Sequence, residues 1–156
     1  MKNALNNQLQ DLYQTDSYLW LQKTVELLKA EDFRHLDLEG LIEELESWGR
    51  SQFNQARSRL RQIIIHLLLW EYWEQEYERN CRHWQSEIIA FRDDLIHELT
   101  ASLQNKLILQ LDSIYHVAVS FVSKKTGLSK SIFPANCPYN FEQLLDDNWY
   151  PNHQLS

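Results

Sequence analysis

One helical pattern runs through the middle of the chain for 33 residues, from Leu38 to Trp70. Its apolar side chains recur with a period near 3.6 and are Leu38, Leu41, Ile42, Leu45, Trp48, Phe53, Ala56, Leu60, Ile63, Ile64, Leu67 and Trp70. The pattern predicts one helix over residues 38–78, either straight or bent at Gly49. At 1.5 Å per residue, the length of such a helix exceeds what a single partner helix can cover in a compact domain. We therefore expect several other helices to cover it.

Few residues interrupt the remaining helical patterns, because the chain holds only three Gly and three Pro. Further helices are predicted over residues 16–30, capped by Asp16, over 84–99, and from Ser102 to a stop at Gly127. In the first of these, one apolar face is formed by Tyr18, Leu21, Val25 and Leu28. Pro-containing dipeptides and aromatic residues follow, and Asn140 is expected to cap a short helix at 141–147. The predicted fold is all-α, an up-and-down helical bundle with one long central helix and a C-terminal arm (128–156) packed on it. We expect a single domain over residues 1–156.

Charge and cysteine content narrow the function classes. The formal net charge is −7 at pH 7, which disfavours binding to nucleic acid or to an anionic membrane. Two cysteines, Cys81 and Cys137, are too few for a secreted disulfide framework. The N-terminal sequence has no apolar signal core, and no apolar run approaches the roughly twenty residues of a membrane span. The expected compartment is the cytoplasm.

The segment 63–73 is apolar on all sides of a helix. Nine of its eleven residues are apolar or aromatic, with only His66 and Glu71 as exceptions. Such a segment is covered either by the chain's own helices or by another chain. The surplus of aromatic residues around it favours a non-catalytic protein-interaction or scaffold domain. Its expected contact residues for a protein partner or a homo-oligomer are Trp70, Trp73, Tyr77 and Trp84.

A polar site around His66, Glu43 and Glu44 is a second candidate. His66 lies at the edge of the apolar face, where a nearby carboxylate would make it a general base or a ligand. The glutamates lie about 30 Å away along a straight helix, so they reach His66 only if the helix folds back. The alternative is a core-edge histidine hydrogen-bonded to a neighbouring helix.

Two acid–histidine pairs define the alternative function, a metal-binding protein or metal-dependent enzyme. Asp93 with His97, and Asp112 with His116, are each spaced i,i+4, which places both side chains on one helix face. If the two helices pair antiparallel, the four side chains would converge on a divalent cation. Solvated ion pairs on a helix surface explain the same spacing. The sequence holds no recognised catalytic motif, and we predict no cofactor.

A set of ordered landmarks resembles one bacterial family. They are Leu12-Tyr13, Asp16, Trp20, Leu36-Asp37, residues 41–46 with Gly49, residues 66–70, Trp84, Arg92, Tyr115, Ala118, residues 126–128, Phe133-Pro134, residues 137–139 and residues 142–145. In this order they are similar to the family catalogued as domain of unknown function twenty-nine, over about residues 11–151. Leu69 departs from the Lys expected there. The resemblance implies an all-helical fold in a bacterial cytoplasm and no known activity.

Overall fold

The computed structural model describes residues 4–153 and the side chains of residues 8–153. Seven α-helices and two short 3-10 helices, with no strand, make up this described part. The all-α prediction is therefore confirmed. The chain divides into two compact units, Met1–Ser51 and Gln52–Ser156, and the helix α3 (Leu38–Tyr72) has residues in both. The prediction of a single domain stays a prediction. None of the described helices combines the length and the apolar character needed to cross a lipid bilayer.

The first unit contains α1 (Ala4–Thr15), α2 (Ser17–Lys29), the 3-10 helix η1 (Phe33–His35) and the beginning of α3. Asp16 caps α2 as predicted, since its side chain accepts a hydrogen bond from the backbone N–H of Leu19. Asp37 does the same for α3 by accepting from the N–H of Gly40 at 3.2 Å. Its second carboxylate oxygen accepts from the Trp20 indole N–H at 3.1 Å. The helix α1 was not predicted.

The long helix ends earlier than the sequence indicates, at Tyr72 rather than near residue 78. Trp73 leaves the helical conformation, with φ −95° and ψ 72°, while its N–H still closes the last turn on the Leu69 carbonyl. The next helix, α4 (Glu74–Glu98), begins directly after it. Its start lies ten residues before the predicted start at Trp84, because periodicity does not register a one-residue break between two helices. Gly49 lies inside α3.

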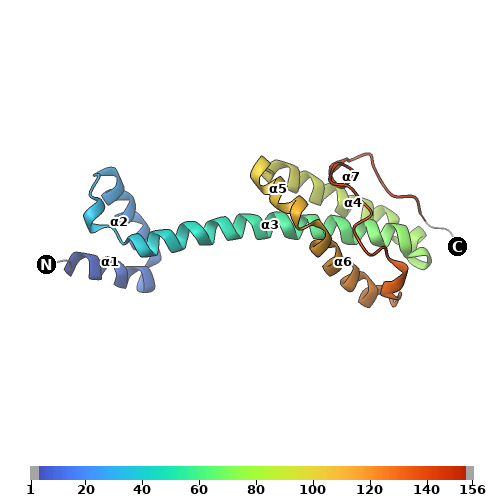
Figure 1. The fold of residues 1–156 in the computed structure, drawn as a ribbon, viewed down its shortest axis with the longest axis horizontal. Helices are drawn as coiled ribbons and strands as arrows, with labels where there is room; N and C mark the ends of the chain where they lie inside the picture. Colours follow the sequence, from blue (N-terminus) through green and yellow to red (C-terminus); the bar gives the residue numbers. More distant parts are fainter. Residues whose placement is uncertain (1–3, 154–156) are drawn as a thin grey trace. The chain divides into compact units, whose positions relative to one another are not determined.

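The core of the second unit forms around its part of α3. Consecutive residues 63–65 and 67–69 are all buried, so this helix is covered on several sides. The covering helices are α4 and α6 (Leu111–Thr126), and Figure 1 shows both beside the second half of α3. From α4 the core receives Trp84, Ile88 and Leu95, and from α6 it receives Ile114, Tyr115, Ala118, Val119 and Val122. The chain's own helices thus cover the apolar segment.

The helix predicted from Ser102 to Gly127 is two helices, α5 (Ala101–Leu109) and α6. Gln110 interrupts it with φ −105° and ψ 8°, and no Gly or Pro marks this break in the sequence. The cap of α5 is Thr100 rather than Ser102, since the Thr100 hydroxyl accepts from the N–H of Leu103. Gly127 ends α6 in the left-handed conformation, with φ 78°, as its sequence position predicted.

The C-terminal segment, residues 128–153, packs on the second unit as expected. It contains the 3-10 helix η2 (Lys130–Ile132) and α7 (Phe141–Leu145), which Asn140 caps with a reciprocal hydrogen bond to Gln143. The helix is two residues shorter than the predicted 141–147. Phe133, Tyr139, Phe141 and Leu144 of this segment are buried in the core.

Arg92 of α4 binds the C-terminal segment through buried hydrogen bonds. Its guanidinium is fully buried and donates from Nε to the Leu144 carbonyl at 2.9 Å. Nη2 donates to the carbonyls of Gln143 and Trp149, each at 3.0 Å. The Gln143 carbonyl also accepts the N–H of Asp146 at 3.4 Å, and one cation serves three acceptors at the end of α7 and beyond it. Burial lowers the pKa of Arg92.

Candidate functional site

The four aromatic residues expected to bind a partner lie within the second unit. Trp84 is only 3% exposed, and Trp73 stacks on it with ring centroids 5.9 Å apart. The ring centroid of Trp70 lies 5.1 Å from that of Tyr77 and 5.0 Å from that of Tyr150 in the C-terminal segment. Most of this aromatic surface is therefore in contact with the chain's own side chains.

His66, Glu43 and Glu44 are divided between the two units, with the glutamates in the first and His66 in the second. The Nδ1–H of His66 donates to the Gln62 carbonyl of its own helix at 2.7 Å. The imidazole is partly buried, with the Phe91 ring 5.9 Å away, and this burial lowers its pKa. His66 is a core-edge histidine, but its hydrogen bond is made within α3 instead of with a neighbouring helix.

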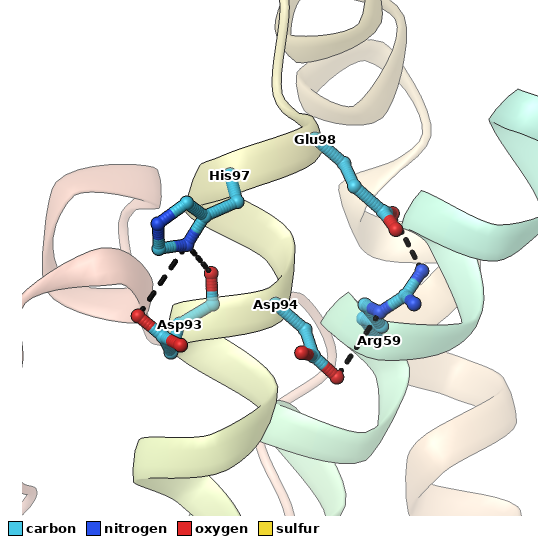
Figure 2. Close-up of polar contacts among 5 residues, drawn as sticks. All are labelled: Arg59, Asp93, Asp94, His97 and Glu98. Carbon is cyan, nitrogen blue, oxygen red and sulfur yellow. Dashed lines mark hydrogen bonds and ion pairs between the residues drawn. The ribbon is translucent and has the colours of Figure 1, made fainter.

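The first acid–histidine pair lies on the exposed side of α4. His97 Nδ1 donates to the Asp93 carbonyl at 2.7 Å and lies 3.4 Å from the Asp93 carboxylate, and the two together raise its pKa. Figure 2 shows this pair turned away from Arg59 of α3, whereas Asp94 and Glu98 point toward it. Arg59 lies 2.5 Å from Glu98 and 3.5 Å from Asp94.

The second pair, on α6, holds the C-terminal segment. Asp112 accepts the backbone N–H of Cys137 at 2.9 Å, and His116 Nε2 donates to the Ala135 carbonyl at 2.7 Å. Within residues 8–153 no three His, Cys, Asp or Glu side chains form a group able to hold a metal ion. The expected convergence of Asp93, His97, Asp112 and His116 does not occur, because one pair faces solvent and the other binds backbone.

An apolar stripe on the first part of α3 is largely exposed among the described residues. Leu38, Ile42, Leu45 and Trp48 follow one another at helical spacing and are 61%, 49%, 60% and 66% exposed. Gly40, on another side of the helix, is the residue that faces Trp20 and Asp37. We name the four exposed side chains the α3 stripe. Large contiguous apolar patches at a protein surface are typical of interaction sites.

The second helix of the same unit carries a similar exposed face. Tyr18, Leu21, Val25 and Leu28 are 70%, 50%, 38% and 39% exposed. Nine of the sixteen large apolar side chains exposed in the described part of the chain belong to the first unit, although it is only a third of the chain. The sequence predicts one apolar face on α2 and cover by other helices along α3, and in the first unit both apolar faces are largely exposed. The buried residues described in this unit are instead Leu9, Trp20, Thr24, Leu36, Asp37 and Gly40.

A polar pocket of about 300 Å³ opens between α1 and α3. Its walls are Gln10, Tyr13, Gln14, Asp37, Glu39, Gly40 and Glu43. Tyr13 lies 4.9 Å from the Trp20 ring, and its partial burial, a hydrogen bond to Glu44 and the charge of Glu43 raise its pKa to about 12. The pocket therefore combines carboxylates with a neutral phenol and is suited to a cation.

A larger pocket of about 430 Å³ lies between α1, α2 and η1. Its lining is apolar at Leu9, Leu12, Leu27 and Ala30. Charged residues of both signs, Lys23, Glu26 and Asp32, also line it. Because neither sign dominates, this pocket favours no ligand class.

Sequence reasoning missed both the exposure of the α3 stripe and the polar pocket beside it. The pocket gave no local signal, because it depends on Tyr13 of α1 meeting a helix that begins 25 residues later.

Comparison with known families gives one match. The model of the family described as domain of unknown function DUF29 matches residues 12–150. No curated protein and no solved structure matches the chain. The landmarks named above, from Leu12-Tyr13 to the end of α7, all fall inside the matched range. The chain belongs to the DUF29 family, a domain of unknown function.

Proposed function

We propose that this chain is a non-catalytic protein-interaction domain that binds a partner protein through the α3 stripe. The observation that carries the proposal is the exposure of Leu38, Ile42, Leu45 and Trp48, at least half of each side chain in three of the four. The stripe spans about 15 Å of helix, which matches three turns of a partner helix. The cytoplasm, favoured by the sequence, stays the predicted compartment.

The energetic argument concerns the water around these four side chains. Full burial of a large apolar side chain contributes about 1.5–3 kcal/mol, and roughly half of each remains to be buried. Covering the stripe therefore gives on the order of 3–6 kcal/mol before the cost of association. Since association itself costs at least about 4 kcal/mol, the stripe alone supports at most a very weak complex, and the exposed α2 face of Tyr18, Leu21, Val25 and Leu28 supplies the further area that a stable complex needs.

The metal-dependent alternative receives no support from a specific contact. Asp112 and His116 already bind backbone groups of residues 135–137, and Asp93 with His97 provides only two neighbouring ligands. We therefore develop only the interaction function.

The test is affinity capture with the full chain and two double variants. Leu45→Ser with Trp48→Ser removes half of the α3 stripe without touching a buried residue. Val117→Ser with Phe121→Ser is the matched control, since these α6 side chains are each 50% exposed. Capture from an extract of the source cells is quantified by mass spectrometry, after circular dichroism has verified the helicity of each variant.

We expect specific partner proteins to be lost with the stripe variant and retained with the control. The decisive comparison is between the two double variants. Equal retention of every captured protein by both would remove the α3 stripe as the binding surface.

A further inference from the structure

The charge around the α3 stripe has one sign. Residues 38–49 contain Glu39, Glu43, Glu44 and Glu46 and no Lys or Arg. In the whole first unit ten acidic residues face five basic ones, so five of the seven net negative charges lie in a third of the chain. Any partner that covers the stripe meets this negative field at its rim.

The polar pocket lies directly at one edge of the stripe. Glu39 and Glu43 line the pocket, and Glu39 is also the i,i+3 neighbour of Ile42 on the helix surface. A side chain that extends from a helix seated on the stripe therefore passes Glu39 on its way into the pocket. The pocket volume of about 300 Å³ is ample for a lysine or arginine end group.

We propose that the partner is an amphipathic helix whose apolar side chains are flanked by Lys or Arg, one of which enters the pocket of Tyr13, Asp37, Glu39 and Glu43. This inference rests on the proposed function and specifies the chemistry of the partner. The apolar spacing determines which helical face docks. The carboxylates determine the charge of its flanks.

Two other occupants fit the charge less well. A second copy of this chain would bring its own Glu39, Glu43, Glu44 and Glu46 against the same residues, in either orientation, because the segment has no positive charge. A membrane surface is anionic and would repel the same carboxylates. Both become outcomes of the experiment.

The experiment uses the full chain and three fluorescein-labelled synthetic helical peptides of ~16 residues. The first has Leu at i, i+4 and i+7 spacing with Lys at the flanking positions. The second keeps the Leu positions and replaces each Lys by Glu. The third contains the residues of the first in an order that breaks the apolar face. Binding is followed by fluorescence anisotropy at low and high salt.

We expect the Lys-flanked peptide to bind at least roughly tenfold more tightly than the Glu-flanked one at low salt, since several exposed charge pairs each contribute a little. High salt should narrow this ratio through screening. The scrambled peptide should bind weakly at both salt concentrations, because its charge lacks an apolar face. Equal binding of the scrambled and the ordered Lys peptides would overturn the proposal, since it would reduce the interaction to net charge.

Protein variants locate the interaction on the surface. Glu39→Gln with Glu43→Gln should weaken the Lys-flanked peptide roughly fivefold and leave the Glu-flanked one unchanged or tighter. Leu45→Ser should weaken both peptides. The control Val117→Ser should change neither.

The outcomes separate the two proposals. If both peptides bind equally and Leu45→Ser weakens both, the stripe binds helices but the charge inference is wrong. If no peptide binding depends on Leu45, the stripe itself is refuted. If the chain self-associates in analytical ultracentrifugation and Leu45→Ser abolishes this, the occupant of the stripe is a second copy of the chain and not a basic helix. If the chain binds phosphatidylserine vesicles and Leu45→Ser abolishes this, the occupant is a membrane.

Discussion

Removing the guanidinium of Arg92 should release the C-terminal segment from the second unit. The substitution Arg92→Met keeps a long apolar stem and deletes three hydrogen bonds, to the carbonyls of Leu144, Gln143 and Trp149. A hydrogen bond from a charged donor contributes about 1.5–3 kcal/mol, and an unpaired buried carbonyl adds its own desolvation cost. The variant also removes the cost of burying a cation, which offsets part of the loss. We expect the free energy of unfolding to fall by about 3–5 kcal/mol.

Urea denaturation followed by circular dichroism measures this loss, and limited proteolysis reports where the structure opens. Cleavage should begin between residues 128 and 153 in the variant. The control is Arg82→Met, because Arg82 lies on the same helix and is exposed. The reasoning is refuted if the two variants lose equal stability, or if the C-terminal segment of Arg92→Met resists protease as the parent does.

Three further predictions use single side chains. Gly40→Ala should destabilise the first unit by roughly 1–3 kcal/mol, because a Cβ at this position would lie 2.4 Å from Asp37 Oδ2. A Cβ at Gly49 would meet no atom within 4 Å, so Gly49→Ala should stabilise the protein by up to about 1 kcal/mol. Thermal denaturation of both variants checks the opposite signs. Burial lowers the pKa of His66 below its ordinary value of 6.5. The folded state therefore favours the neutral imidazole, and His66 contributes fully to the free energy of unfolding above pH 6.5. This contribution should be lost as the pH falls from 6.5 through the lowered pKa of the folded state. Urea midpoints at pH 7 and pH 5 should therefore differ more in the parent than in His66→Gln. Thr100→Ala should lower stability by about 0.5–2 kcal/mol through loss of the α5 cap, as measured by urea denaturation.

The helical class could be predicted because its signals are local. The 3.6-residue period over residues 38–70 appears in the structure as α3, and the caps Asp16, Asn140 and Gly127 stand where their chemistry placed them. Breaks without Gly or Pro could not be predicted. Trp73 and Gln110 interrupt helices through their backbone conformation alone, and neither residue type is a helix terminator.

Which apolar faces are covered could not be read from periodicity. The apolar face of α2, from Tyr18 to Leu28, and the α3 stripe are as regularly spaced as the apolar residues of α3 that pack in the core of the second unit. Most side chains of these two faces are nevertheless exposed. Coverage depends on how many helices surround a segment, and this number is set by contacts between distant parts of the chain. The same limit explains why Trp70 and Trp84 were expected at a surface while the C-terminal segment and α4 bring them into contact with other aromatic side chains.

The acceptors of Arg92 lie 51, 52 and 57 residues after it in the sequence. During synthesis on the ribosome, α3 and α4 emerge well before the carbonyls that accept the hydrogen bonds of this cation. A nascent chain at that stage leaves Arg92 without its acceptors and the places of Tyr139 and Leu144 open to water. We expect native packing of the second unit to form only after α7 leaves the exit tunnel, and the nascent chain to engage chaperones until then.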